Sequence, residues 1–273
     1  MTARRGASKI PGLVPHILLN LLRHVYPLRL RALLFHRLGF CIARPDGPAT
    51  LEFAGVSLRT LSQTDVAHRQ IACLGFYELG LSRRIVKLAA KGGLLVDVGA
   101  NVGYFSCLWA AVNSANRAIA FEASPRMAPV LRDNVEGAGL REQIAVMPFA
   151  LGQETGKKFF DLGPEEQTGW GGLMLKEGPR SVEVEVKRLD EVCGDFCEIS
   201  VLKIDTEGAD TWVLLGAAKL LREKRIRHVF YENNYERMNA LGIEGGEAAS
   251  LLSGCGYRIQ DLGRLGSEIH AYI

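Results

Sequence analysis

Carboxylates stand at or just after the ends of four apolar segments that are typical of buried β-strands. These carboxylates are Asp97, Glu122, Asp205, Glu207 and Glu232. In an open α/β sheet, ligands bind outside the carboxyl ends of the strands, where such side chains meet at one edge. We therefore expect these five carboxylates to surround a ligand, where they could attract a cation or accept a proton.

The loop after the first of these segments carries the most specific signal. An acid is followed by two glycines four residues apart, in the pattern Asp97-x-Gly99-x-x-x-Gly103. A dinucleotide fingerprint needs glycine at its first, third and sixth positions, and here those positions hold Gly99, Asn101 and Tyr104. The two glycines that are present would let the backbone approach a ligand closely, because glycine has no Cβ.

The nature of the cofactor depends on two acids. Glu122 closes the next strand, where a carboxylate can bind both ribose hydroxyls of NAD or of S-adenosylmethionine. NAD would place a negative pyrophosphate at the first loop, whereas S-adenosylmethionine carries an ammonium and a sulfonium. Asp97 attracts a cation and repels a pyrophosphate. The sequence therefore favours S-adenosylmethionine, with an NAD-linked oxidoreductase on a similar sheet as the alternative.

Strand-like and helix-like segments alternate from residue 94 onward. The expected strands are 94–98, 117–121, 143–149, 201–205, 227–231, 257–261 and 268–273, and the expected helices are 102–112, 125–136, 209–221 and 246–252. This order predicts an α/β fold with a mostly parallel sheet covered on both faces. The last two strands have only a short turn between them and should pair antiparallel.

Additional segments are expected around this sheet. A short hairpin at 49–61 and a helix at 82–90 precede it. Strands at 157–161 and 181–187 flank the glycine-rich residues 168–173. Loops at the ligand edge of a sheet commonly form the substrate pocket, so we expect the segment around Trp170 to lie over the site.

Residues 1–48 form a basic extension to a domain that spans residues 49–273. Eight basic residues and no acid precede position 45, so of the total net charge of +3 the remainder carries −5. Apolar clusters predict amphipathic helices interrupted at Pro27, and every apolar run is shorter than a transmembrane helix needs. Residues 1–44 are expected either to pack on the domain or a dimer partner, or to lie on an anionic membrane surface.

The composition is that of a folded intracellular protein. Apolar residues make up 48% of the 273 residues and charged residues 23%, which excludes a disordered or fibrous chain. The six cysteines are scattered, which favours reduced thiols, and Cys193 and Cys197 lack the second pair that a zinc site needs. The acidic body also lacks the basic face that nucleic acids require. We expect a cytoplasmic protein, with membrane association open.

Several motifs together resemble one family, the FkbM-type methyltransferases, which use S-adenosylmethionine. The motifs are LVDVGANVGYFS at 95–106, FEASP at 121–125, LKIDTEGAD at 202–210, VLLGA at 213–217 and, upstream, GFYE at 75–78. The likeness runs in order from about residue 65 to 235, whereas the first 48 residues match nothing in the family.

The resemblance implies a class I methyltransferase fold, with a seven-stranded sheet whose last strand is antiparallel. It also implies O-methylation of a hydroxyl on a natural product, of polyketide or macrolide type, or on a glycan. Transferred by position, the expected cofactor-binding residues are Glu78, Asp97, Gly99, Ala100, Asn101, Gly103, Tyr104, Glu122, Ala123, Ala150 and Asp205. Among these, Glu122 would bind the ribose and Ala150 would lie near the adenine.

Catalysis of methyl transfer to an alcohol needs positioning and a group that takes the proton. The candidates are Asp205, Glu207 and Glu232, although Glu207 could instead serve the N-terminus of the following helix. Asp205, Glu232 and Asn233 could together hold Mg²⁺, which prefers oxygen ligands.

Two histidines and one further alternative remain. His228 lies inside an expected strand and is interpreted as a packed core residue, whereas His68 precedes the cofactor loop and could reach the pocket. The third functional hypothesis is a non-catalytic membrane or partner adaptor with an inactive methyltransferase fold.

Overall fold

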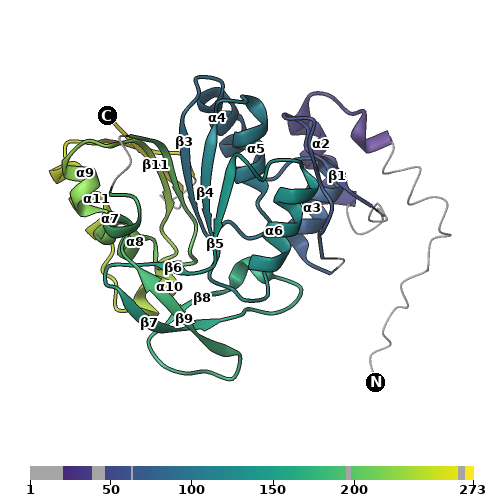
Figure 1. The fold of residues 1–273 in the computed structure, drawn as a ribbon. Helices are drawn as coiled ribbons and strands as arrows, with labels where there is room; N and C mark the ends of the chain where they lie inside the picture. Colours follow the sequence, from purple (N-terminus) through teal and green to yellow (C-terminus); the bar gives the residue numbers. More distant parts are fainter. Residues whose placement is uncertain (1–20, 39–46, 63, 195–197, 264–267) are drawn as a thin grey trace.

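A seven-stranded sheet runs through the centre of the molecule (Figure 1) in the order β12-β13-β11-β10-β3-β4-β5. The structure is a computed structural model that describes residues 21–38, 47–62, 64–194, 198–263 and 268–273. The strands are β3 (Leu94–Val98), β4 (Arg117–Phe121), β5 (Ile144–Met147), β10 (Ile199–Ile204), β11 (Ile226–Glu232), β12 (Arg258–Asp261) and β13 (Glu268–Tyr272). Only β13 runs antiparallel to the other strands of this sheet, and it pairs antiparallel with both β11 and β12. The expected class I methyltransferase sheet is therefore confirmed.

Helices cover both faces of this sheet because side chains alternate along each strand. Leu95 of β3 packs in one core with α4 (Leu79–Ala89), α5 (Tyr104–Val112) and α6 (Ala128–Gly137). Val96 packs in a second core on the opposite face. That core is formed with α7 (Leu189–Val192), α8 (Asp210–Gly216), α9 (Ala218–Arg222) and α11 (Glu247–Gly254).

A second, four-stranded sheet lies at one end of the central sheet (Figure 1) in the order β6-β9-β7-β8. Its strands are β6 (Ala150–Leu151), β7 (Gly156–Asp161), β8 (Gly172–Met174) and β9 (Ser181–Lys187). The pair β7 and β9 is antiparallel and corresponds to the two additional strands expected from the sequence. A 3₁₀ turn, η2 (Thr168–Trp170), precedes β8.

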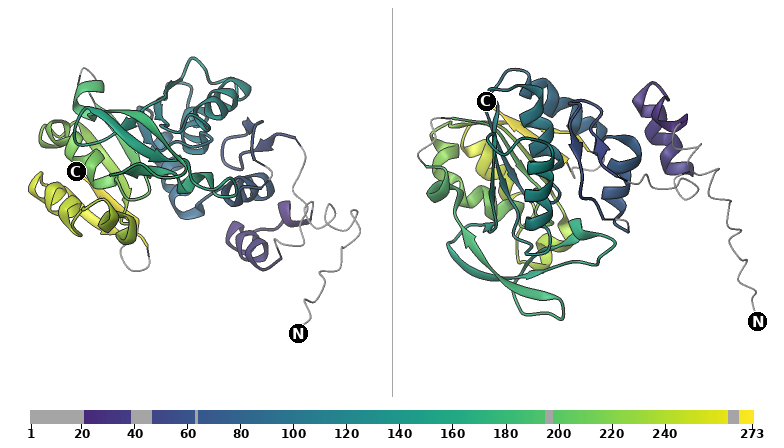
Figure 2. Two further views of the ribbon diagram at one scale, coloured as in Figure 1. Left: turned by 90° about the horizontal axis from the view of Figure 1, so that it is seen from below. Right: turned by 45° about the vertical axis from the view of Figure 1, so that its right-hand side comes forward.

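The described part of the N-terminal extension packs on the domain. Helix α2 (Leu28–Leu38) follows Pro27 and lies beside α3 (Val66–Leu74) at the outer side of the molecule (Figure 2). Arg31 is 1% exposed and donates to Glu52 Oε2 at 2.7 Å. The expected hairpin is present as β1 (Ala49–Thr50) and β2 (Ser57–Leu58). This packing is one of the two arrangements expected for residues 1–44, of which 1–20 and 39–44 lie outside the described residues.

Several predicted boundaries are wrong, for identifiable reasons. Helix α6 starts at Ala128 because the carbonyl of Ser124 accepts from Met127 and Ala128, which makes a separate turn. The single helix predicted over 209–221 is two, α8 and α9, and the strand predicted over 143–149 ends at Met147. Helices α3, α7 and α10 (Tyr235–Ala240) were not predicted at all.

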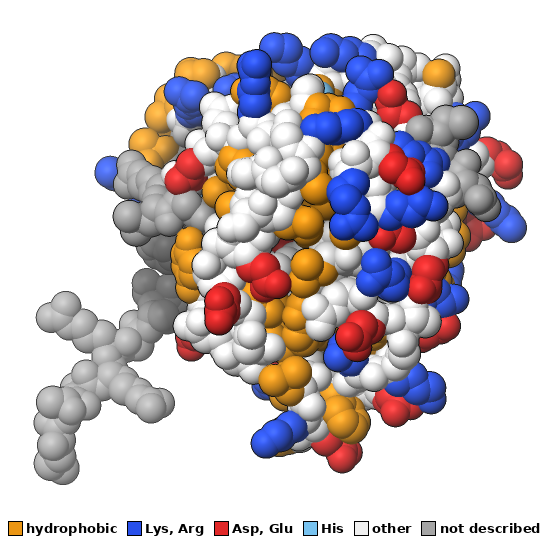
Figure 3. Space-filling model, turned by 90° about the vertical axis from the view of Figure 1, so that its left-hand side faces the viewer, with side chains coloured by type: hydrophobic (Ala, Val, Ile, Leu, Met, Phe, Trp, Pro, Cys, Tyr) orange, Lys and Arg blue, Asp and Glu red, His pale blue; other side chains and the backbone are white. Residues whose placement is uncertain are grey.

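The exterior of the molecule carries charged side chains of both signs (Figure 3). On the side shown in Figure 3, Lys and Arg side chains are interspersed with Asp and Glu. Within the described ranges, no helix combines the length and the apolar character that crossing a bilayer requires. Cys193 is buried as a free thiol, and Cys197 lies outside the described residues.

Candidate functional site

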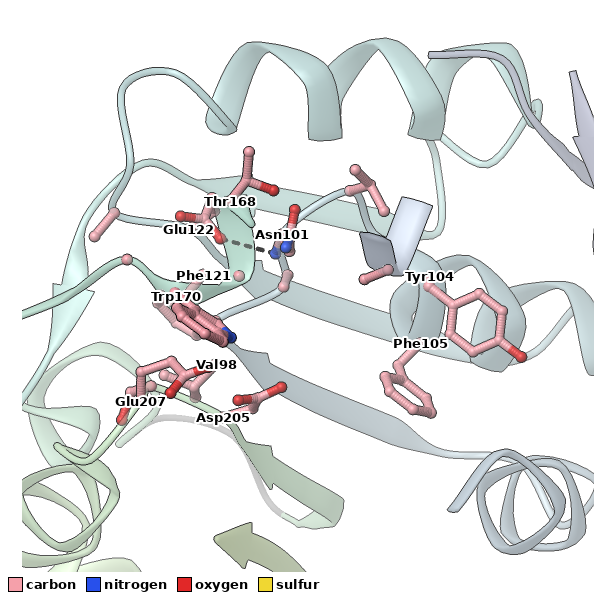
Figure 4. A pocket seen from close by; sticks show the side chains of 18 of the residues that line it. Val98, Asn101, Tyr104, Phe105, Phe121, Glu122, Thr168, Trp170, Asp205 and Glu207 are labelled. Atoms are coloured by element: carbon pink, nitrogen blue, oxygen red, sulfur yellow. Dashed lines mark hydrogen bonds between the residues drawn. The ribbon is translucent and has the colours of Figure 1, made fainter. Parts of the chain in front are cut away.

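A cavity of about 310 Å³ lies at the carboxyl ends of β3, β4 and β10 (Figure 4). The predicted site residues on its wall are Glu78, Gly99, Ala100, Asn101, Tyr104, Glu122, Ala123, Ala150, Asp205, Glu207 and Glu232. Trp170 of η2 also lies on the wall, so the glycine-rich segment does cover the site. The structure thus brings together most of the residues that the sequence singled out.

Two predicted residues, Asp97 and Gly103, do not reach the cavity wall. Asp97 is 1% exposed, and its Oδ2 accepts the Ser106 hydroxyl at 2.6 Å. Gly103 lies against α6, where an added Cβ would stand 2.5 Å from Leu131 Cδ1. Both residues face the core between the sheet and its helices, behind the wall, and their direct contact with a cofactor stays a prediction.

Gly99 allows two strand ends to meet. Its φ is +77°, and an added Cβ would stand 1.9 Å from the carbonyl oxygen of Asp205. The N–H of Gly99 donates to the carbonyl of Phe121 at 3.0 Å. Glycine is therefore required so that the loop after β3 can pass against the end of β10.

Glu122 is held rigidly at the end of β4. Its Oε2 accepts the N–H of Asn101 at 2.8 Å (Figure 4). Its Oε1 accepts the N–H of Ser124, also at 2.8 Å. Burial raises the pKa of Glu122 to about 7, although the two N–H donors oppose this rise. A buried carboxylate fixed in this way has lone pairs left for further donors from a ligand.

Backbone strain is concentrated at the cavity. Four non-glycine residues in the described part of the chain have positive φ, and three of them line the cavity: Glu78 at 41°, Asn101 at 49° and Glu207 at 55°. Such conformations are uncommon for residues with a Cβ, and they cluster at functional sites where the surroundings enforce them. The three residues therefore mark the cavity as a candidate functional site.

Lys203 of β10 is a wall residue that the sequence did not reveal. Its side chain is 4% exposed, and its Nζ lies 3.4 Å from Asp205 Oδ2 and 3.6 Å from Asp97 Oδ1. Burial opposes its charge, but the carboxylates of Asp205 and Asp97 raise the pKa of Lys203 above its usual value. A lysine inside an apolar strand gives no signal by itself. The cross-strand pairing of Lys203 with Asp97 would have shown it.

The carboxylates around Lys203 are strongly perturbed. Burial and the nearby charge of Asp205 raise the pKa of Glu78 to about 7 and that of Glu232 to about 9. The same two causes raise the pKa of Glu207 to about 7, against the opposing effects of Arg237 and Asn234. Carboxyl groups that hold protons near neutral pH are suited to acid and base chemistry.

In the part of the chain that it describes, the structure does not show the magnesium site predicted at Asp205, Glu232 and Asn233. Within the described residues, no three His, Cys, Asp or Glu side chains converge on a point that could hold a metal ion. The Lys203 ammonium already lies beside Asp205, and it would repel a divalent cation there.

The far wall of the cavity is apolar. The rings of Phe121 and Phe149 meet edge to face with centroids 5.5 Å apart, and Ala150 and Leu151 continue the surface. A wall of this kind suits a flat heteroaromatic ring. This apolar wall lies beside Glu122, which directly follows Phe121 at the end of β4.

The two histidines of interest occupy different environments. His68 lines the cavity, with its Nε2 3.3 Å from Asn101 Oδ1. His228 lies on β11, where its Nδ1 is 3.1 Å from His270 Nε2, and neither histidine of this pair lines the cavity. His228 lies inside a strand as predicted, but it is only half-buried, so its interpretation as a packed core residue is not confirmed.

Comparison with known proteins assigns the chain to a protein family. Similar solved structures include a precorrin-6y C5,15-methyltransferase from Geobacter metallireducens (11% identity, 72% of this chain and 91% of the other, TM-score 0.43). An O-methyltransferase from Bacillus cereus in complex with SAH has 13% identity, 72% and 83% coverage and a TM-score of 0.41. None of the curated proteins compared with the chain matches it. The family model for the methyltransferase FkbM domain matches residues 97–259, and the chain therefore belongs to the FkbM methyltransferase family.

Proposed function

We propose that this protein is an O-methyltransferase that moves the methyl group of S-adenosylmethionine to a hydroxyl of a small natural product or a glycan. The observation that carries the proposal is the excess of acidic over basic side chains on the cavity wall. Six carboxylates line it, those of Asp65, Glu78, Glu122, Asp205, Glu207 and Glu232, whereas Lys203 is its one Lys or Arg side chain in the described part of the chain. An acidic cavity suits a cationic cofactor and disfavours the pyrophosphate of NAD.

The residues present fit S-adenosylmethionine. Glu122 would accept hydrogen bonds from the ribose hydroxyls, and the apolar wall of Phe121, Phe149 and Ala150 would hold the adenine. Glu78 and Asp205 would face the ammonium and sulfonium end. The proposed charge preference therefore comes from the whole wall rather than from Asp97, whose charge is shared with Lys203.

The bound cofactor supplies an electrophilic methyl group on a sulfonium, which is released as the neutral thioether when the acceptor oxygen bonds to the methyl carbon. The chain's own part is to hold the hydroxyl in line with that methyl group, which supplies about 7–11 kcal/mol in well-oriented reactions. Asp205 and Glu207 stand where they could accept a hydrogen bond from the hydroxyl. Trp170 lies over the same end of the cavity (Figure 4) and would exclude water.

Glu232 is the proposed group that removes the hydroxyl proton. It lines the cavity at the end of β11, and its raised pKa makes it a stronger base than an ordinary carboxylate once it is ionised. A positively charged cofactor nearby would favour that ionisation. Glu232→Gln should lower kcat by roughly 10²-fold, the lower limit for loss of a general base, with little change in the affinity for S-adenosylhomocysteine.

The proposal is tested by transfer of a labelled methyl group from S-adenosylmethionine to panels of hydroxylated glycans, lipids and polyketides. Mass spectrometry of the product would locate the methyl group on oxygen. Transfer to nitrogen or carbon would refute O-methylation. Absence of transfer to every hydroxylated acceptor, in protein that binds the cofactor, would count against this choice of substrates.

A further inference from the structure

A buried carboxylate at the start of α3 has two different partners. Asp65 is 1% exposed. Its Oδ1 accepts the N–H of His68 at 2.9 Å, which caps the helix. Its Oδ2 accepts both the N–H of Thr168 at 2.7 Å and the Thr168 hydroxyl at 2.8 Å. One carboxylate therefore joins α3 to a turn that lies 103 positions later in the sequence.

The turn that Asp65 binds is the roof of the cavity. Thr168 and Trp170 belong to η2, and both line the cavity. The N–H of Val66 donates to the carbonyl of Glu166 at 3.1 Å. From the other side, Arg237 Nη2 donates to the carbonyl of Trp170 at 2.8 Å. Residues 166–170, here called the roof segment, are thus held by α3 at one end and by α10 at the other.

His68 extends the contact to the cofactor loop. Its Nδ1 accepts the N–H of Ser62 at 3.0 Å, so the ring proton is assigned to Nε2. That atom lies 3.3 Å from Asn101 Oδ1 and 3.4 Å from the Thr168 hydroxyl oxygen. The N–H of Asn101 in turn donates to Glu122. The roof segment and the proposed ribose carboxylate are therefore joined through one continuous set of hydrogen bonds.

We propose that Asp65 is a positioning residue for this methyltransferase: it fixes the roof segment over the cavity and, through His68 and Asn101, couples that position to cofactor binding. The coupling to the cofactor rests on the proposed function, whereas the fixing of the roof segment does not. Helix α3 precedes the residues that match the family model, 97–259. The chain thus completes its cofactor site with a residue from outside the matched region.

Asp65→Asn separates this role from helix capping. Asparagine caps helices about as well as aspartate, so its amide oxygen can keep the bond to His68. Its amide nitrogen would then face the two donor groups of Thr168, neither of which it can accept. We expect the variant to fold with nearly unchanged stability while the roof segment detaches.

Trp170 reports on the roof segment directly. It is 52% exposed, whereas Trp109 is 0% and Trp212 is 6% exposed, so quenching of tryptophan fluorescence by acrylamide mainly measures Trp170. In ligand-free protein, Asp65→Asn should increase the quenching. It should also raise KM for S-adenosylmethionine about tenfold, as expected for lost hydrogen bonds to a charged acceptor, with a smaller change in kcat.

Matched variants complete the test. Asp190→Asn alters a carboxylate that accepts the N–H groups of Lys219 and Leu220 away from the cavity, and it should leave Trp170 quenching unchanged. Thr168→Val removes the hydroxyl bond to Asp65 but keeps the N–H bond, so it should give part of the effect of Asp65→Asn, and Thr168→Ser should retain wild-type behaviour. The double variant with Asp65→Asn and Thr168→Val should be little worse than Asp65→Asn alone, because both substitutions act on the same contact.

The outcomes are distinguishable. Unchanged quenching and unchanged KM in Asp65→Asn would overturn the proposal, and so would a loss of stability without a change in quenching, because Asp65 would then be only a helix cap. If the wild-type protein binds neither S-adenosylmethionine nor S-adenosylhomocysteine, the proposed function fails. The quenching of ligand-free protein would still decide whether Asp65 holds the roof segment.

Discussion

Lys203 and Asp97 form an ion pair behind the cavity, with Nζ 3.6 Å from Oδ1 and with side chains that are 4% and 1% exposed. The two residues are direct neighbours on the parallel strands β10 and β3. The pair joins the acid of the first glycine loop to the strand that carries Asp205. A motif residue that the sequence assigns to the cofactor is thus partly neutralised by the protein itself.

Replacement of Lys203 should lower the free energy of unfolding. Lys203→Met would leave Asp97 buried without its counter-charge, and breaking a buried pair in this way destabilises proteins by about 3–5 kcal/mol. Lys203→Arg should lose less stability, because arginine keeps the positive charge beside Asp97. Urea denaturation would measure the change. Lys157→Met is the control, because Lys157 pairs with Glu183 on the surface, where such pairs contribute about 0–1 kcal/mol. Equal losses at the two positions would contradict the account.

Stability should fall with rising pH in ligand-free protein. Burial and neighbouring charges raise the pKa of Glu232 to about 9. Between pH 7 and pH 9 the folded protein therefore keeps a proton that the unfolded chain has already lost. Such a group stabilises the fold fully below its unfolded pKa, and this contribution is lost as the pH rises through the folded pKa.

Measurement of Tm from pH 7 to pH 9 tests this dependence. The window lies above the range in which His270 acts, because burial lowers its pKa to about 4 and its effect is confined to acid pH. Glu232→Gln should give a flatter curve, since it has no proton to lose. A variant whose Tm falls as steeply as that of wild type would show that Glu232 is not the group responsible.

Two glycines with similar backbone angles provide a matched pair. Gly99 has φ of +77° and Gly139 has φ of +71°, but only at Gly99 would a Cβ collide with the backbone of Asp205. Gly139→Ala should lower the free energy of unfolding by about 1–2 kcal/mol, because alanine disfavours the left-handed backbone conformation. Gly99→Ala should cost clearly more and should abolish binding of S-adenosylhomocysteine. Similar unfolding free energies for the two variants would show that the close approach of the strand ends is not important.

The strand pattern and the glycine loop could be predicted because they are local. Apolar runs such as 117–121 and 201–204 specify strands by themselves, and the acid that follows each run is then placed by topology at the ligand edge. For this reason the sequence alone predicts that Glu122, Asp205 and Glu232 lie at one edge of the sheet.

The missed features depend on tertiary contacts. Lys203 is buried only because β10 pairs with β3, and Asp65 reaches Thr168 only because the second sheet folds back over the cavity. Helix α3 did carry a local signal, an Asp65 cap at its start and Gly75 at its end, and it could have been predicted from these two residues. The positive φ of Glu78 and Glu207 is likewise imposed by the surroundings.

The central claim, an S-adenosylmethionine site at the ends of β3, β4 and β10, is tested most directly by isothermal titration with S-adenosylhomocysteine, run in parallel with NAD. We predict one saturable site for S-adenosylhomocysteine, at least tenfold weaker in Glu122→Gln because the carboxylate is the proposed ribose acceptor, and no binding of NAD. Binding of NAD by wild-type protein that does not bind S-adenosylhomocysteine would contradict the account.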